Sequence, residues 1–121
     1  MRDRTEVDDA VQGAANRALL EQILPPIRRA AKGVGYAVTV HGSLNRDVDL
    51  VAIPWTEKAK GTEALIQALR GAITSVCGNC MMNGDGSDKP HGRRAQLLLV
   101  YCGENHLTID LSVMPTTSKK E

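Results

Sequence analysis

The sequence predicts an α+β fold in which a small mixed or antiparallel β-sheet has helices packed on one face. Two hydrophobic patterns support this prediction. Apolar residues recur every three or four positions over residues 6–24 and 57–76, which is the period of a helix with one buried side. Apolar and polar residues alternate over residues 36–41 and 107–114, which is the period of a strand with one buried face. We therefore expect the helices on the apolar side of the sheet and a polar, open opposite side.

Length and composition indicate a single globular domain over residues 1–121. A chain of this length can bury a core without disulfides or a structural metal, and its 42% hydrophobic and 24% charged residues exclude the disordered and fibrous classes. Phenylalanine is absent and aromatic residues make up 2% of the chain, so we expect an aliphatic core and no extensive stacking of bases. The net charge of +1 provides no overall field for a polyanion, so a nucleic-acid role would need a local basic patch.

The N-terminus and the cysteines favour a reducing, cytoplasmic location. Residues 1–10 are charged and contain no apolar run with a cleavage site. No stretch of the chain has the length of a membrane span, so we expect no membrane partner. The three cysteines are an odd number, which fits reduced thiols better than a secreted disulfide framework.

A helical segment is expected over residues 1–34. Thr5 followed by Asp8 is typical of a capping box and predicts a first helix over about residues 6–24. The Pro25-Pro26 pair is expected to break that helix and to start a short second one, because proline is tolerated in a first helical turn. We interpret the exposed side of the second helix as a solvated face with three cations: Arg28, Arg29 and Lys32.

Four strands and one long helix are expected in the rest of the chain. The strands are predicted at residues 36–41, 47–53, 95–102 and 107–114. Pro54 is expected to stop the pairing of the second strand, and Gly103–His106 is expected to join the last two strands as a hairpin. The helix lies within residues 57–76, with Thr62 as its expected cap.

Residues 77–94 show no hydrophobic period and are rich in turn formers. They exceed the usual length of a connection in a compact domain, so we expect a long loop of the kind that is often functional. Residues 115–121 are polar and are expected to be a frayed tail.

The strongest functional signal is the stretch HGSLNRDVDLVAIPW at residues 41–55. Asp47 and Asp49 are two residues apart, so on a strand both carboxylates leave the same face and can hold a divalent cation. Asp110 lies on the polar face of the last predicted strand. If these strands are adjacent, the three carboxylates could bind one or two Mg²⁺ ions, an arrangement that suits phosphoryl transfer.

These residues resemble the nucleotidyltransferase superfamily, which includes DNA polymerase beta, the nucleotide-adding enzymes of transfer RNA and the antibiotic nucleotidyltransferases. The pattern of the family is a strand ending in Gly-Ser, an acid-x-acid strand and a third acid on a later strand. Gly42-Ser43, Asp47-Val48-Asp49 and Asp110 match it in this order, and the match spans residues 36–114. The resemblance implies a nucleotidyltransferase-like fold and the transfer of a nucleoside monophosphate from a nucleoside triphosphate, with Mg²⁺ or Mn²⁺.

The resemblance also implies roles for these residues. Asp47 and Asp49 would bridge the metal ions, and Asp110 would act as a ligand and general base. Gly42 and Ser43, with nearby backbone amides, would hold the terminal phosphates. Three residues separate Ser43 from Asp47, whereas the family usually has a longer connection that often includes a short helix.

Further basic residues are candidates for binding phosphate. Arg46 lies beside the Gly-Ser turn and could bind phosphate or pair with an acid. A later basic cluster could bind triphosphate or an RNA backbone, or could be a solvated loop: Lys89, His91, Arg93 and Arg94. The hydroxyl acceptor is not identified by the sequence, and an RNA or a protein are candidates. The alternative is a non-catalytic module of the same fold that binds a nucleotide, a nucleic acid or a protein partner.

Three other signals have a functional and a structural interpretation. Cys77 and Cys80 have the spacing of zinc ligands in a zinc-stabilised interaction protein, with His91, Cys102 or His106 as further ligands, but we favour two thiols at a helix end. We interpret His41 as a hydrogen-bonded structural histidine. Trp55 could stack on a base, but we expect it to close the core.

Overall fold

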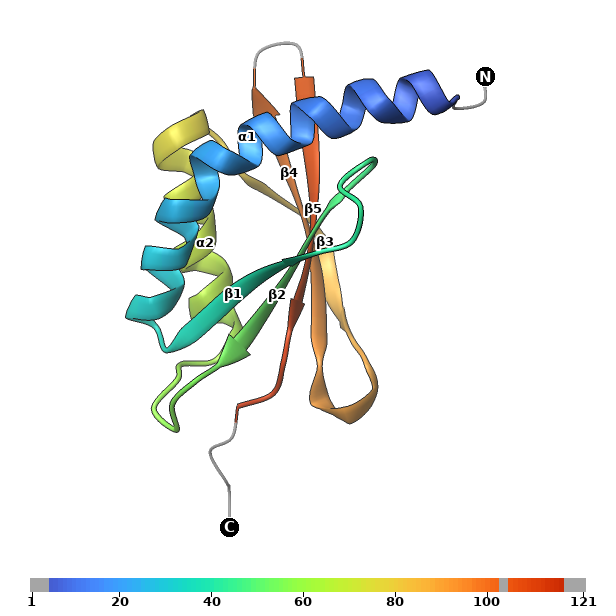
Figure 1. The fold of residues 1–121 in the computed structure, drawn as a ribbon. Coiled ribbons are helices and arrows are strands. Elements are labelled where there is room, and N and C mark those ends of the chain that lie inside the picture. The colour runs from blue at the N-terminus through green and yellow to red at the C-terminus, as the bar shows by residue number, and fades with distance from the viewer. Residues whose placement is uncertain (1–4, 103–104, 117–121) are drawn as a thin grey trace.

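The computed structural model describes residues 5–102 and 105–116 and has a mixed five-stranded sheet with two α-helices on one face (Figure 1). In chain order the elements are α1 (Glu6–Gly33), β1 (Tyr36–His41), β2 (Val48–Pro54), α2 (Thr62–Cys77), β3 (Met81–Asp88), the 3₁₀ turn η1 (Pro90–Gly92), β4 (Arg94–Cys102) and β5 (Asn105–Val113). The strand order is β1-β2-β5-β4-β3; β2 and β5 run parallel, and the other neighbours run antiparallel. The predicted α+β class is confirmed.

The helix α1 is continuous through Pro25 and Pro26, so the predicted break after residue 24 is wrong. Each proline removes one hydrogen bond to the carbonyl four residues earlier, at Glu21 and Gln22. Both of these residues are exposed, so water can hydrate the freed carbonyls. Ile23 and the following turn stay packed in the core, and the helix accommodates the prolines by bending (Figure 1).

The start of α1 agrees with the sequence. The Thr5 hydroxyl accepts a hydrogen bond from the Asp8 N–H at 3.1 Å, and the Thr5 N–H donates to the Asp8 carboxylate at 3.0 Å. The predicted capping box is therefore confirmed. Thr62 is not the cap of α2: the N-cap is Gly61, which makes no side-chain bond, and Thr62 is the first helical residue.

The strands on both sides of the candidate site follow their predicted alternation. In β1 the buried and exposed residues alternate from Tyr36, and in β5 Leu107, Ile109, Leu111 and Val113 are buried. β2 begins at Val48, one residue later than expected. Pro54 was expected to end the pairing of this strand, and it is itself the last paired residue, opposite Tyr36. β4 and β5 pair antiparallel as the hairpin prediction requires, whereas residues 103–104 of its turn and 117–121 of the predicted tail lie outside the described residues.

The predicted loop over residues 77–94 is wrong, because it contains β3 and η1. β3 is an edge strand whose residues are mostly exposed, so its sequence has no apolar period. Its register with β4 shifts between Asn83 and Ser87, and Gly84 and Gly86 there have φ of +82° and +80°. A Cβ on Gly86 would lie 2.9 Å from the Ala95 carbonyl oxygen, so this bulge depends on glycine.

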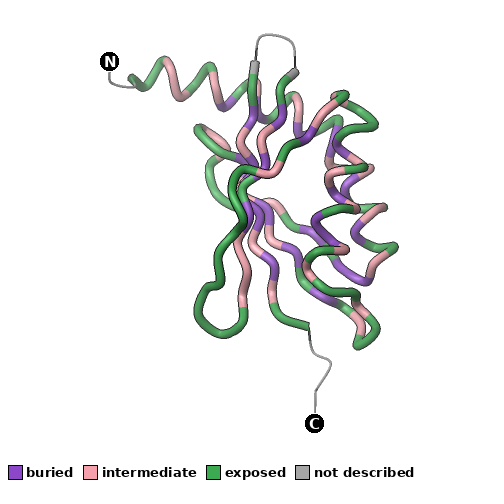
Figure 2. The backbone as a smooth tube through the Cα atoms, turned by 180° about the vertical axis from the view of Figure 1, so that it is seen from behind, coloured by how far each residue is buried: buried purple, intermediate pink, exposed green. Residues whose placement is uncertain are grey.

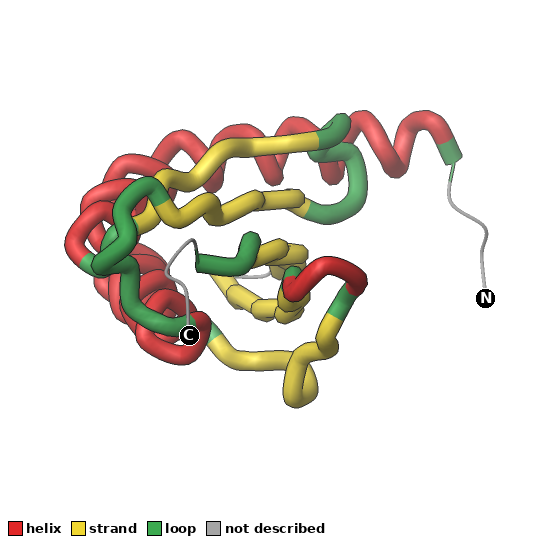
Figure 3. Tube along the Cα trace, turned by 90° about the horizontal axis from the view of Figure 1, so that it is seen from below, coloured by secondary structure: helices red, strands yellow, loops and turns green. Residues whose placement is uncertain are grey.

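The core is aliphatic, as predicted, and lies between the helices and the sheet (Figure 2). Its largest fully buried side chains are Tyr36, Ile23, Ile27, Leu50, Leu65, Ile66, Leu69, Ile73, Leu98, Leu107, Ile109 and Leu111. Trp55 does not close this core, since 59% of it is exposed. Seen from below, α1 and α2 lie along one side of the sheet (Figure 3). Over residues 5–102 and 105–116, neither α-helix has the length and apolar character of a membrane span.

Candidate functional site

Two acids of the predicted trio that are far apart in the sequence are neighbours on the open face of the sheet. Asp49 on β2 is paired in register with Asp110 on β5, and its other register partner is His41 on β1. The same row continues through Leu97 of β4 to Asn83 of β3. Because register partners on adjacent strands project from the same face, the structure brings Asp49 and Asp110 side by side.

Asp47 lies in the bend immediately before β2 and is exposed. Its charge still acts on Asp49: burial raises the pKa of the Asp49 carboxyl, and the negative charges of Asp110 and Asp47 raise this pKa further. His41 lowers the pKa of Asp49, and His41 is exposed on the same row as the acids. All three predicted acids therefore contribute to one negative electrostatic site.

The donor chemistry of this site suits a hard divalent cation. Carboxylate oxygens are the ligands that Mg²⁺ and Mn²⁺ prefer, and repulsion among Asp47, Asp49 and Asp110 is what a cation would relieve. Within the described part of the chain, no three His, Cys, Asp or Glu side chains converge closely enough to form a metal-binding group as they stand. The charge and the donor type of these residues thus suit such an ion, whereas their side chains do not converge on one point in this structure.

Gly42 gives the Asp49 carboxylate its space. Gly42 has a φ of +81°, a conformation that residues with a side chain rarely adopt, and a Cβ there would lie 2.7 Å from Asp49 Oδ2. The positive φ therefore favours glycine at the end of β1, and a side chain there would also force the Asp49 carboxylate to move.

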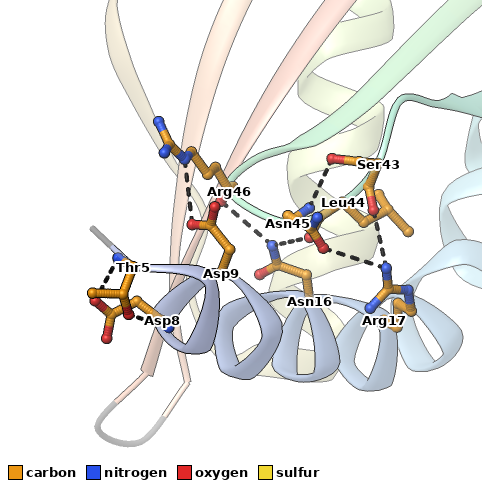
Figure 4. A network of polar contacts seen from close by, with 9 residues as sticks. All are labelled: Thr5, Asp8, Asp9, Asn16, Arg17, Ser43, Leu44, Asn45 and Arg46. Carbon is orange, nitrogen blue, oxygen red and sulfur yellow. Dashed lines mark hydrogen bonds and ion pairs between the residues drawn. The ribbon is translucent and has the colours of Figure 1, made fainter. Parts of the chain in front are cut away.

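The turn after Gly42 is held by α1, whose N-terminal half runs beside it (Figure 4). The Asn16 amide donates to the Leu44 carbonyl at 2.7 Å and to the Arg46 carbonyl at 3.4 Å, and it accepts from Gln12 at 2.8 Å. Arg17 donates to the Ser43 carbonyl at 3.1 Å. The connection between Ser43 and Asp47 contains no helix, so side chains of α1 supply its support.

Sequence reasoning missed this support. Two signals were present: a polar Asn16 on the apolar side of a helix, where it is 1% exposed, and a Gly13 in the middle of that helix. A Cβ on Gly13 would lie 2.5 Å from the Asn45 side-chain oxygen, so glycine lets the turn approach α1 closely. Buried polar residues need hydrogen-bond partners, and the backbone of the turn provides them.

Replacing Asn16 by Leu is expected to lower the free energy of unfolding by about 1–3 kcal/mol, because the Leu44 carbonyl loses its buried donor. Urea unfolding monitored by circular dichroism would measure the loss. The matched control is Gln22→Leu, on an exposed part of the same helix, which should change stability by less than about 0.5 kcal/mol. Equal effects of the two changes would show that Asn16 does not anchor the turn.

Ser43 and Arg46 are already engaged within the protein. The Ser43 hydroxyl accepts a hydrogen bond from the Asn45 N–H at 3.3 Å. Arg46 forms an ion pair with Asp9 of α1, with 3.4 Å between Nε and Oδ1 (Figure 4). Of the two interpretations of Arg46, the structure shows the pair with an acid.

A cleft of about 420 Å³ lies on the side of Asp110 that is away from Asp49, between the β3 bulge and β5. Arg93 and Lys89 line it together with Asp110 and Ser112, and Arg93 donates to the Ser112 hydroxyl at 3.1 Å. Two cations thus lie beside an acid of the trio. They can attract a phosphate, which would then lie next to the Asp110 carboxylate.

Arg94 is not brought to this cleft. It lies on the face of β4 that also carries the buried Gln96, and it pairs with Asp88 with 3.1 Å between Nε and Oδ1. It also donates to the Asp85 carbonyl at 3.3 Å. Arg94 therefore stabilises the β3–β4 edge, whereas the adjacent Arg93 faces the acids.

The cysteine pair lies at the end of α2, away from the acidic row. Cys80 is 4% exposed, and burial raises the pKa of its thiol to about 11. In the described residues, Cys77 and Cys80 form no metal-binding group with either His91 or His106, and the Cys102 side chain lies outside the described part of the chain. The arrangement supports thiols at a helix end.

Comparison with known proteins adds no family to these observations. No protein-family model matches the chain, and no curated protein matches it.

Proposed function

We propose that this protein is a metal-dependent nucleotidyltransferase that moves a nucleoside monophosphate from a nucleoside triphosphate to a hydroxyl acceptor. The observation that supports the proposal most is the register pairing of Asp49 with Asp110, next to the Gly42 turn and the charge of Asp47. This is the arrangement that the resemblance to nucleotidyltransferases requires, and it comes from strands that are far apart in the sequence.

Each residue has a role in the proposal. Asp47 and Asp49 would hold Mg²⁺ or Mn²⁺, and Asp110 would be a ligand and would accept the proton of the acceptor hydroxyl. When bound, the ion would neutralise charge on the triphosphate. The Gly42-Ser43 turn would receive phosphate through backbone N–H groups, since a glycine turn leaves them accessible.

Arg93 and Lys89 would provide countercharge for the transferred or terminal phosphates. Both line the cleft that includes Asp110, so a phosphate bound there would lie near the metal ligands. We place the reaction in the cytoplasm, a location that the odd number of cysteines in the sequence favours.

The direct test is pyrophosphate release from each labelled nucleoside triphosphate in the presence of Mg²⁺ or Mn²⁺. Candidate acceptors are supplied in parallel, and EDTA is the control that removes the ion. Pyrophosphate release that depends on the ion supports the proposal. If no triphosphate binds under any metal condition, the enzyme proposal is wrong.

Binding without turnover would favour the alternative, a non-catalytic module of the same fold. The absence of three converged metal ligands among the described residues is the observation that keeps this alternative in view. Isothermal titration with a non-hydrolysable triphosphate would measure binding, and the pyrophosphate assay with the natural nucleotide would measure turnover. A binding module should bind the triphosphate and release no pyrophosphate from the natural nucleotide.

Arg93→Ala is expected to weaken triphosphate binding by about tenfold, since a charge-assisted hydrogen bond contributes about 1.5–3 kcal/mol. Arg94→Ala removes the same charge one residue away, from a side chain that pairs with Asp88 and does not line the cleft, and is expected to leave this binding within about twofold. The dissociation constants from titration give the comparison. Equal weakening in both variants would indicate a general charge effect rather than a cleft contact.

A further inference from the structure

A second hollow, of about 540 Å³, lies at the free edge of β1, at the opposite end of that strand from Gly42. It is lined by Arg28, Lys32, Tyr36, Ala37, Val38 and Trp55. Its residues come from the last turns of α1, the start of β1 and the residue after β2. None of them belongs to the acidic site.

Trp55 presents its indole ring to solvent at this hollow. It is the only tryptophan of the chain and is 59% exposed, although a ring of this size is normally buried. Its backbone N–H donates to the Gly35 carbonyl at 3.0 Å, which holds residue 55 beside the start of β1. The exposed ring is thus carried by backbone that is hydrogen-bonded to the chain just before β1.

Two cations accompany the ring. Arg28 and Lys32 are four residues apart on α1 and therefore lie one turn apart on the same side of the helix. Over residues 5–102 and 105–116, neither forms an ion pair with a carboxylate. The hollow therefore combines an aromatic surface with two positive charges whose countercharge is not supplied by the described chain.

The free edge of β1 is poorly suited to bind a peptide as an added β-strand. The Arg28 Nε donates to the Val38 carbonyl at 3.2 Å, so an outward carbonyl that an added strand would use is already occupied. The same bond fixes the guanidinium of Arg28 at the rim. The chemistry left for a ligand is stacking on a flat ring with negative charges beside it.

We propose that this hollow binds single-stranded nucleic acid, with one base stacked on Trp55 and adjacent phosphates at Arg28 and Lys32. Proteins bind single strands without sequence preference by this combination of an aromatic surface and basic side chains. Two cations one helical turn apart can serve two phosphates, which a strand provides and a nucleoside monophosphate does not. The proposal is independent of nucleotidyl transfer.

The sole tryptophan makes the binding directly observable. A short oligothymidylate, titrated at low salt, is expected to quench the fluorescence of Trp55, and Asp49→Asn should show the same quenching. Thymidine monophosphate should bind at least tenfold more weakly. The slope of log K against log salt should be about −1.4, as expected for two phosphates of a single strand.

Lys32→Ala is expected to weaken oligothymidylate binding severalfold and to reduce the salt slope by about 0.7. Arg29→Ala is the matched control, because Arg29 is exposed on the same helix and does not line the hollow; it should leave the slope unchanged. Trp55→Ala, followed by the anisotropy of a labelled strand, should weaken binding by about 10- to 100-fold, and Trp55→Phe by less. Circular dichroism verifies that each variant is folded.

Several results would overturn the proposal. One is the absence of quenching by the oligonucleotide, and another is equal loss in the Lys32→Ala and Arg29→Ala variants. Equal affinity for thymidine monophosphate would make the hollow a mononucleotide site instead. Equal affinity for poly-glutamate would show that only negative charge is recognised. Because none of these measurements uses catalysis, they fail separately from the test of nucleotidyl transfer.

Discussion

Asp49→Asn is expected to lower the proposed nucleotidyl transfer by about 10²-fold or more and, at neutral pH, to raise the stability of the folded chain. Activity falls because an amide replaces a carboxylate at the centre of the acidic row. Stability rises because the folded state holds the Asp49 charge against burial and against the charges of Asp110 and Asp47. The amide removes that repulsion at nearly the same shape.

The pH dependence follows from the direction of the shift. The pKa of Asp49 is raised on folding, so between its unfolded and folded pKa the native chain binds more protons than the unfolded chain. The contribution of Asp49 to the free energy of unfolding therefore falls as pH rises from the unfolded pKa through the folded one. The gain in the Asp49→Asn variant should be absent below the unfolded pKa and complete above the folded pKa.

Thermal unfolding at several pH values, combined with a pyrophosphate assay, tests both effects. A midpoint that is higher than that of the original chain at pH 7 and equal to it at pH 3 is the expected result. Glu57→Gln makes the same chemical change at an exposed acid outside the site and should alter neither quantity appreciably. An Asp49→Asn variant with unchanged activity would overturn the role of the acidic row in catalysis.

Gly42→Ala is expected to destabilise the chain by about 1–2 kcal/mol through its positive φ, and more if the new methyl group cannot be accommodated. The methyl group would lie 2.7 Å from Asp49 Oδ2, so the carboxylate must move and activity should fall with it. Urea unfolding and the pyrophosphate assay measure the two losses.

Gly71→Ala provides the matched control. Gly71 is exposed in α2, does not have a positive φ, and a methyl group added there would meet no atom within 4 Å, so the change should stabilise the helix by about 0.5–1 kcal/mol. A Gly42→Ala chain that is as stable and active as the original would show that the turn is not constrained by Asp49.

The parts of this protein that were predictable are those in which local pattern and burial agree. β1 and β5 have one buried face and one open face, so their alternation appears in the sequence and assigns Asp110 to the open side. The Thr5 cap depends on residues three apart and is equally local. β3 was missed because an exposed edge strand gains its hydrogen bonds from β4 and needs no apolar period.

Around the site, too, the features that the sequence did not predict depend on partners that are distant in the chain. That Arg93 faces the acids and Arg94 the opposite side depends on where β4 begins, and the support of the Gly42 turn depends on Asn16, far away in the chain. The continuity of α1 through two prolines depends on the packing of Ile23 and Ile27 in the core. Each of these is set by partners that no local spacing reveals.

By itself, the sequence determined the aliphatic core and the parity of β1 and β5, because these depend on composition and on spacings of a few residues. The tertiary structure decided which acids are adjacent, what holds the turn beside them and that Trp55 lies outside the core. The physical reason is that strand register and helix packing are chosen by the total burial of the chain, and a single segment does not contain that information.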